Sequence, residues 1–588
     1  MFKFFLKTIH KLDTKLCLLL MGVFSLLRVY IGVNLPIWFF SNSIHDDVLL
    51  LRYSNLPLHF QSWDITTLVK GISYPIFLFF VNFSGLSYRF WLALCWIFAG
   101  LVISIGIYKF ITKNKALILL IFLFILFSPI GFDSDCALRV YRNAIIAPFT
   151  IIFLGCLFVF IGELISKIQN NKKIIIWGIL LGLTFTFTFY IKEDGIMTMP
   201  IFLIPIFVVL IIKLFVEFKH KKFNLNNLVG LTKIAVLCLI PVVIFSMGTI
   251  TYKEVNNHYF GLYEINTRTD GELGEFYQNL LKIDDSNKTT NVWVPLSTLE
   301  KAWNASPTLQ SHPELLNDLK HSKWANGDLN KTPIEGDYIA WALRDSLDNV
   351  SLFNNETQAN DLFFKVNNEL DDSFENGKLD KSEKIFVTGS LPGKNVDEII
   401  KLAPYISAGL SSCMFYNYTI IDLSPKIAST NVVEDAVSKN AELILNDNLL
   451  VVNESNINTV NFKEKIPLAL ANLDICVYQI ISYILVPIAG LVFIFGCIYQ
   501  FNAKFKDSTL NLLLGLQFLV LVTFIGQIFA IAWFSEWIPC EPYLVMKFYT
   551  VASQGFFAFF EVLAISTLIY FLQKHDFNVF SKYFKRNG

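Results

Sequence analysis

The sequence predicts an α-helical polytopic membrane protein with about ten transmembrane helices and an extracytoplasmic α/β soluble domain. Of the 588 residues, 54% are hydrophobic and only 16% are charged, whereas about a quarter of the residues in a soluble domain carry a charge. The apolar residues also lie in long blocks. The 48 basic and 48 acidic side chains cancel, which argues against a nucleic-acid-binding protein, because such proteins neutralise phosphates with Lys and Arg.

The apolar blocks have the length that a bilayer requires. About 20 residues in a helix cross the ~30 Å hydrocarbon core, and we expect ten segments to do so, of which 116–131 is the shortest and ends near Pro129. The stretch 72–86 contains Pro75, Asn82 and Gly85, and we expect it to form a helix in the outer interface. The ten segments are 16–39, 88–109, 116–131, 144–166, 174–191, 195–216, 234–252, 473–498, 509–534 and 546–573.

The orientation follows from the distribution of Lys and Arg, which are enriched in cytoplasmic loops. With the N-terminus inside, every predicted cytoplasmic segment is basic, including those around Lys113, Lys173 and Lys504. An eleventh span at 72–86 would place nearly all of these clusters outside. We therefore expect a multi-pass plasma-membrane protein with both termini in the cytoplasm, and the abundant Lys, Asn, Ile and Phe are typical of an AT-rich bacterial genome.

The spans divide the chain into three predicted domains. Residues 1–252 form an N-terminal membrane domain with seven spans, in which the first outer loop, 40–87, includes the interfacial helix. Residues 253–472 form the extracytoplasmic soluble domain, and residues 473–588 form a C-terminal membrane domain with three spans and a cytoplasmic tail. In the soluble domain NNELDDSFENGKLDKSEK predicts a helix and a polar turn, whereas IFVTGS and LLVVNES predict short strands. Its Trp and Phe residues favour a folded core over disorder.

Ionisable side chains gather in three loops that are predicted to emerge on the same face. A charge near a membrane is costly and usually faces a cavity or a partner, so these loops are the candidates for a functional site. The first loop reads SNSIHDDVLLLRYSNLPLHFQSWD, the second FDSDCALRVYRNAI and the third FYIKEDGIMTMP. The candidate residues are His45, Asp46 and Asp47 in the first loop, Asp133, Asp135, Arg139 and Arg142 in the second, and Lys192, Glu193 and Asp194 in the third.

The adjacent carboxylates Asp46 and Asp47 suit two tasks. One of them is a candidate general base, and together they are candidate ligands for a divalent cation. The alternative is an acidic interfacial loop without chemistry.

The basic residues of the second and third loops have two interpretations as well. Arg139 and Arg142 are three residues apart, so on a helix they would share a face and grip a phosphate from two sides; otherwise they anchor the loop at the interface. Lys192 either extends to the membrane surface or belongs to the site. Glu193 and Asp194 either cap the following span or belong to the site.

An acidic pair directly after the first span, followed by an interfacial helix with Tyr74-Pro75 and by Arg89 at the start of the next span, resembles the GT-C class of membrane glycosyltransferases. The resemblance covers roughly residues 15–220. Within the class, the chain is similar to the protein mannosyltransferases and aminoarabinose transferases. Mannosyltransferases commonly have Asp-Glu where this chain has Asp-Asp.

The resemblance implies a fold, a reaction and roles for the candidate residues. It implies a GT-C-like enzyme that moves a sugar from a polyprenyl-phosphate donor to a glycan, lipid or protein acceptor on the outer face, with inversion at the anomeric carbon. Asp46 or Asp47 would be the catalytic carboxylate, and Arg139, Arg142 and Lys192 would hold the donor phosphate. The remaining expected substrate-binding residues are His45, Tyr74, Glu193 and Asp194. A divalent cation at Asp46 and Asp47 stays open, as do two other functions: a transporter or flippase of lipid-linked glycans, and a non-catalytic surface assembly protein.

Overall fold

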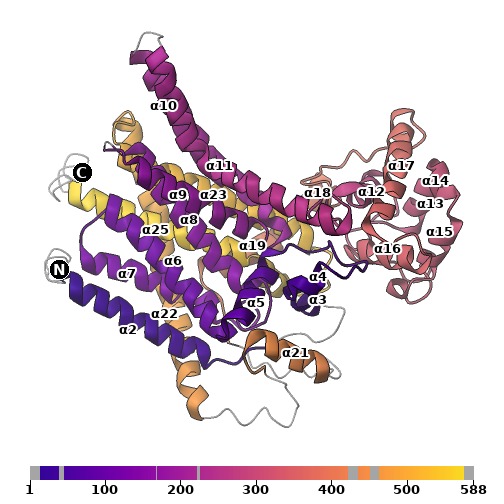
Figure 1. The fold of residues 1–588 in the computed structure, drawn as a ribbon, viewed down its shortest axis with the longest axis horizontal. Coiled ribbons are helices and arrows are strands. Elements are labelled where there is room, and N and C mark those ends of the chain that lie inside the picture. The colour runs from indigo at the N-terminus through magenta and orange to yellow at the C-terminus, as the bar shows by residue number, and fades with distance from the viewer. Residues whose placement is uncertain are drawn as a thin grey trace.

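The computed structural model describes residues 13–38, 46–166, 168–220, 225–420, 435–449 and 462–574. Within this part of the chain, nine helices are long and apolar enough to cross a membrane, so the protein is a multi-pass helical membrane protein. They correspond to nine of the ten predicted spans and lie side by side in one bundle (Figure 1). The nine are α2 (Thr14–Val33), α6 (Tyr88–Phe110), α8 (Asn143–Ile165), α9 (Asn171–Phe189), α10 (Met199–His220), α11 (Leu225–Phe260), α22 (Phe462–Asn502), α23 (Ser508–Ser535) and α25 (Val551–Lys574).

The tenth predicted span, 116–131, is a shorter helix than expected. Helix α7 (Lys115–Leu126) has 12 residues and is ~18 Å long at 1.5 Å per residue. A 3₁₀ turn, η1 (Pro129–Phe132), follows it, because proline has no amide hydrogen to continue the helical hydrogen bonds. Helix α7 starts beside the start of α2, where the Cys17 thiol donates to the Lys115 carbonyl at 3.5 Å. The start of α2 and the end of α25 lie at the same end of the bundle (Figure 1).

The first predicted loop folds into short helices at the opposite end of the bundle. These are α3 (Asp46–Ser54), α4 (Leu56–His59) and α5 (Ser73–Ser84). Helix α5 coincides with the predicted interfacial helix and has 12 residues, too few to span. It ends at Gly85, whose φ of 68° is the left-handed conformation that glycine adopts without strain.

Beyond α11, residues 265–391 form a helical unit that projects from the bundle (Figure 1) and is called the inserted domain below. Phe276, Trp293 and Phe363 are buried in its own core, and α12 and α17 each bury one apolar side. Its helices are α12 (Gly271–Lys282), α13 (Leu296–Ala305), α14 (Pro307–Gln310), α15 (Pro313–Lys320), α16 (Tyr338–Asn349) and α17 (Glu356–Glu375), with a 3₁₀ turn, η3 (Lys323–Ala325).

The α/β prediction for this domain is wrong in its described residues, which contain helices and no strand. The segment IFVTGS forms a single bridge, between Ile385 and Lys394, and Ile385 and Val387 are exposed. The helices already fill the core, so no neighbouring strand completes a ladder with this segment. The other predicted strand, LLVVNES, lies outside the described residues from position 450 onward. The predicted helix NNELDDSFEN is confirmed as part of α17.

The end of the predicted soluble domain packs with the membrane helices instead. It comprises α18 (Val396–Ile400), α19 (Ala403–Met414) and α21 (Asp435–Leu445), and α19 lies against α23 and against α24 (Pro542–Tyr549). The Cys413 thiol lies 3.7 Å from the Thr550 carbonyl and the Tyr416 hydroxyl donates to Glu561. Both partners lie at or within the last span, so this segment helps to build the end of the bundle near α3.

Candidate active site

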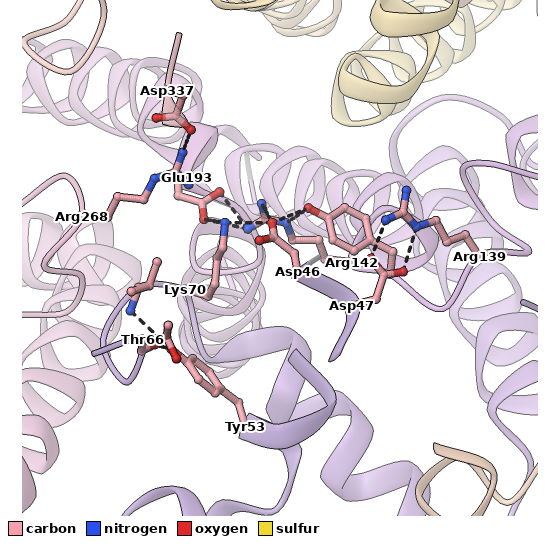
Figure 2. A network of polar contacts seen from close by, with 12 residues as sticks. Asp46, Asp47, Tyr53, Thr66, Lys70, Arg139, Arg142, Glu193, Arg268 and Asp337 are labelled. Atoms are coloured by element: carbon pink, nitrogen blue, oxygen red, sulfur yellow. Dashed lines mark hydrogen bonds and ion pairs between the residues drawn. The ribbon is translucent and has the colours of Figure 1, made fainter. Parts of the chain in front are cut away.

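Five of the predicted site residues lie close together where the bundle and the inserted domain join (Figure 2): Asp46, Asp47, Arg139, Arg142 and Glu193. Each comes from a chain segment that has just left, or is about to enter, a helix: Asp46 begins α3, Arg142 immediately precedes α8, and Glu193 begins η2 (Glu193–Thr198), which leads into α10. Because α8 has 23 residues and is ~34 Å long, a group at its first residue lies near the membrane boundary.

Asp46 lies among three donors that all contact one of its oxygens. Oδ2 lies 2.8 Å from Lys70 Nζ and 3.5 Å from Arg142 Nη2, and it accepts a hydrogen bond from the Tyr141 hydroxyl at 3.1 Å. Among the described residues, none donates to Oδ1 within hydrogen-bond distance, and the side chain is 25% exposed. Burial raises the pKa of Asp46, but Lys70 and Arg142 outweigh it and lower the pKa to about 2. Asp46 therefore presents one accessible, ionised oxygen.

Asp47 faces a different partner. Arg139 donates to both of its oxygens, from Nε to Oδ1 at 2.8 Å and from Nη2 to Oδ2. The Asp47 side chain is completely buried, and the Arg139 guanidinium lies over Trp38, Tyr141 and Phe548 at 5.5, 4.9 and 5.2 Å from the ring centres. Burial lowers the pKa of Arg139, but Asp47 outweighs this and raises it. This closed arrangement resembles a structural ion pair more than a substrate site.

Arg142 connects Asp46 with Glu193. Both Glu193 oxygens lie within 2.8 Å of Arg142 Nη1, and Arg142 Nε donates to the Tyr141 hydroxyl at 2.9 Å. Lys70 lies 3.6 Å from Glu193. Burial lowers the pKa of Arg142, but Glu193, Tyr141 and Asp46 outweigh it and raise the pKa. Two carboxylates and two cations thus alternate in one cluster.

Arg139 and Arg142 do not share a helix face, so that part of the prediction is wrong. Helix α8 begins only at Asn143. The backbone around Arg139 is extended and pairs with Trp38, whose amide donates to the Leu138 carbonyl at 2.9 Å and whose carbonyl accepts from Val140 at 2.7 Å. The two guanidinium groups consequently face different carboxylates (Figure 2).

The other predicted residues lie at varying positions around this cluster. Lys192 is buried, with its ammonium 5.9 Å from the centre of the Tyr549 ring, and it forms no ion pair within 4 Å in the described part of the chain. Burial lowers the pKa of Lys192. Asp194 likewise forms no ion pair with the described residues, and the buried Tyr74 shares a hydrogen bond of 3.0 Å with Tyr88. His45 lies outside the described residues.

Sequence reasoning missed Lys70, Tyr141, Arg268 and Trp341. Lys70 had a usable signal, because it is a Lys in a predicted external loop, where the charge rule expects few. Burial lowers the pKa of Lys70, although Asp46 and Glu193 oppose this effect. Arg268 and Trp341 come from the inserted domain: Arg268 pairs with Asp337, and the Trp341 ring centre lies 5.6 Å from both Lys70 Nζ and the Arg268 guanidinium. No local pattern marks either residue.

A second ionic cluster supports the loop that carries Arg139 and Arg142. Lys547 Nζ lies 3.1 Å from Asp133 and 3.2 Å from Asp135, and all three are buried. Asp133 also accepts backbone hydrogen bonds from Asp135, Cys136 and Thr419 at 2.9 to 3.0 Å. Burial lowers the pKa of Lys547, but Asp133 outweighs it and the pKa is raised. Asp133 and Asp135, which the sequence indicated as candidate site residues, therefore stabilise the conformation of this loop.

The chemistry of the donor set bears on the possible divalent cation. The described residues contain no cluster of three or more His, Cys, Asp and Glu side chains that would hold a metal ion. Asp46 and Asp47 pair with different basic side chains. A divalent ion that bridged the two carboxylates would have to displace Lys70 from Asp46 and Arg139 from Asp47.

Comparisons of the chain with models of protein families, with characterised proteins and with solved structures found no match.

Proposed function

We propose that the protein is a GT-C-like glycosyltransferase that moves a sugar from a polyprenyl-phosphate donor to an acceptor at the cell envelope, with inversion at the anomeric carbon. The observation that carries this proposal is the Asp46 carboxylate: one oxygen contacts Lys70, Arg142 and Tyr141, and the other receives no hydrogen bond from the described residues. A general base needs such an oxygen within reach of its substrate, and cations beside it suit a departing phosphate.

In this mechanism Asp46 Oδ1 takes the proton of the acceptor hydroxyl as the acceptor oxygen bonds to the anomeric carbon. The bond between that carbon and the phosphate oxygen breaks, and the electron pair leaves with polyprenyl phosphate. Lys70, Arg142 and Lys192 stabilise the negative charge that develops there. Glu193 holds Arg142 in place through its two short contacts.

The low pKa of Asp46 describes the cluster without a donor. A base with a pKa of about 2 is weak. A donor phosphate that attracts Lys70 and Arg142 would weaken their hold on Asp46 and move its pKa toward the ordinary value of about 3.9. Donor binding would therefore activate Asp46 as a base. Without a bound donor, Asp46 would stay paired with Lys70 and Arg142 and would be too weak a base to deprotonate the acceptor.

The position of the cluster suits a substrate that is half lipid. Arg142 and Lys192 directly precede α8 and η2, so a phosphate bound there lies at headgroup depth while its polyprenyl chain stays in the bilayer. We place this end of the bundle on the outer face of a plasma membrane, with both termini in the cytoplasm, on the strength of the basic segments at the other end.

A transporter or flippase of lipid-linked glycans is the second candidate, and one observation favours it. The spans themselves contain buried charges: Arg28 on α2 and Glu561 on α25. Arg28 donates to the Gly131 carbonyl at 3.1 Å and lies over Phe132, but its Nε and Nη1 have no hydrogen-bond partner among the described residues. Ionisable side chains within spans often mark a substrate path.

One experiment separates the two candidates. Purified full-length protein in lipid nanodiscs is incubated with a panel of polyprenyl-phosphate sugars and cell-envelope glycans, and release of polyprenyl phosphate is measured. Wild type should release it, and Asp46→Asn should release it ~10²–10⁴ times more slowly while still binding polyprenyl phosphate.

The matched measurement uses vesicles that contain the same lipid-linked sugars. If Asp46→Asn and wild type move these lipids between leaflets equally and neither releases polyprenyl phosphate, the glycosyltransferase proposal is wrong and the transporter is favoured.

A further inference from the structure

Lys70 lies at the end of a segment that is attached to the inserted domain. The segment 64–70 lies in the connection between α4 and α5. Ile65 within it and Trp63 just before it pack against the core of the inserted domain. Arg344, on α16, donates from Nη1 to the Ile65 carbonyl at 2.6 Å and from Nη2 to the Thr267 hydroxyl at 2.5 Å. The Thr267 amide in turn donates to the Leu68 carbonyl at 2.8 Å. Two carbonyls of the segment are thus held by the inserted domain.

The bundle holds the other side of the same segment. The Tyr53 hydroxyl donates to the Thr66 carbonyl (Figure 2) and accepts from the Val69 amide at 3.4 Å. Directly after Lys70, Gly71 lies so close to the Tyr190 carbonyl that a Cβ atom at this position would be 2.3 Å from its oxygen. Lys70 therefore enters the ionic cluster from a segment that is fixed between two bodies.

Arg344 is unusual for a charged residue in this position. It is only 2% exposed, and no carboxylate lies within 4 Å of its guanidinium in the described part of the chain; Glu356 acts on it only at longer range. An arginine that is buried without a close counter-ion is costly. The guanidinium lies over the Phe353 ring at 5.4 Å, and its hydrogen bonds to Ile65 and Thr267 both fix the segment that ends at Lys70.

We propose that Arg344 is a positioning residue for Lys70: together with Thr267 it sets where the Lys70 ammonium meets Asp46 and Glu193. Trp341 lies one helical turn before Arg344 on α16, and the centre of its ring is 5.6 Å from Lys70 Nζ. Helix α16 therefore approaches the segment at two points, the Ile65 carbonyl and the Lys70 ammonium. The consequence for donor binding rests on the proposed function; the placement of the segment does not.

The test compares full-length wild type with Arg344→Gln, Arg344→Lys and Thr267→Val. Thr267→Val keeps the shape of the side chain and the amide hydrogen bond to the Leu68 carbonyl, and it removes both the acceptor for Arg344 and the 3.4 Å hydroxyl contact to that carbonyl. Lys288→Gln is the matched control, because Lys288 is a partly buried lysine of the same domain that donates to three carbonyls, those of Leu280, Leu281 and Ile283, and it does not contact segment 64–70.

Two readouts are measured on each purified variant: hydrogen–deuterium exchange of the peptide that covers 64–70, and affinity for polyprenyl phosphate. Arg344→Gln and Thr267→Val should speed exchange in 64–70 and weaken polyprenyl phosphate binding, about tenfold for Arg344→Gln, which corresponds to losing one charge-assisted contact. Arg344→Lys should recover part of both. In a Lys70→Gln background, Arg344→Gln should weaken binding no further.

Unchanged exchange at 64–70 in Arg344→Gln and Thr267→Val, or equal loss of binding in Lys288→Gln, would overturn the positioning role. If wild type itself does not bind polyprenyl phosphate, the proposed function fails, and the exchange readout still decides whether Arg344 positions the Lys70 segment.

Discussion

Arg139 and Asp47 form a two-point ion pair from which solvent is almost excluded, and this pair separates Asp47 from its neighbour Asp46. Adjacent residues of a helix point about 100° apart, so the two carboxylates of α3 enter different surroundings. Asp46 keeps an accessible oxygen beside Lys70 and Arg142, whereas Asp47 is neutralised inside an aromatic enclosure. One acidic pair thus supplies a candidate base and a structural anchor.

The two aspartates should respond differently to the same substitution. Asp46→Asn should still fold, with stability reduced less than in Asp47→Asn because Glu193 keeps both Lys70 and Arg142 paired, and it should lower the transfer rate by ~10²–10⁴. Asp47→Asn should leave Arg139 buried without its counter-ion and destabilise the fold by ~3–5 kcal/mol. Transfer rate and thermal unfolding in one detergent measure both effects. A stable, fully active Asp46→Asn variant would remove Asp46 from the catalytic site.

Arg142 and Arg139 should also respond differently to substitution, Arg142 in donor binding and Arg139 in stability. Arg142→Lys should weaken binding of a polyprenyl-phosphate sugar, because lysine offers a point charge where arginine offers a planar fork, and Arg142→Ala should weaken it further. Arg139→Lys should lower the unfolding temperature while binding stays close to that of wild type, since its fork is occupied by Asp47. Equal affinity across wild type and both Arg142 variants would refute the phosphate role of Arg142.

Donor binding should decline at alkaline pH. Burial lowers the pKa of Lys192 and of Lys70 below the usual value for lysine, which is about 10.4. A phosphate prefers the charged ammonium, so affinity should fall as pH rises through these lowered pKa values, that is, below pH ~10.4. Lys192→Arg should shift this decline to higher pH, because arginine stays charged there.

The matched control for this pH profile is Lys320→Arg, at a partly exposed lysine of the inserted domain that pairs with Glu300. It should leave the profile unchanged. Isothermal titration of polyprenyl phosphate from pH 7 to 10 measures the effect, and an identical profile in Lys192→Arg, in Lys70→Arg and in wild type would contradict the involvement of these lysines.

The buried cluster of Lys547, Asp133 and Asp135 should matter for folding before it matters for chemistry. Lys547→Met would remove the cation that the Asp133 and Asp135 carboxylates share and should cost ~3–5 kcal/mol. Adding Asp133→Asn and Asp135→Asn to Lys547→Met should recover part of the loss, because the two side chains that lost Lys547 are then neutral. Thermal unfolding of the three proteins checks this, and a triple variant less stable than Lys547→Met would be evidence against charge pairing as the cause.

The orientation of the chain is open to a direct test. A reporter fused after Lys173 should be cytoplasmic, and one inserted near Gly377 should be external, because the basic segments lie at the end of the bundle away from the inserted domain. Gly377 lies in an exposed turn with room for an insertion. A cytoplasmic signal from the Gly377 insertion would invert the proposed topology.

The sequence by itself determined the class of the protein and most of its helices. Long apolar blocks are local in the chain, and a helix satisfies its own backbone hydrogen bonds, so nine of the ten predicted spans correspond to observed helices. Two shorter elements differ from the prediction. Helix α7 stops early because of the turn at Pro129. The strand predicted at IFVTGS did not form, because a strand depends on a distant partner that a local pattern cannot supply.

Only the tertiary structure decided how the candidate residues divide into base, anchor and support. Asp47 and Arg139 are 92 positions apart in the chain, and Arg344 lies 279 positions from the carbonyl that it holds. Both contacts exist because helices from distant segments end at one place, where buried charges must find partners. The sequence marked Asp46, Asp47 and Arg142 through their position beside spans, but the open oxygen of Asp46 and the entry of Lys70 depend on packing that no local pattern records.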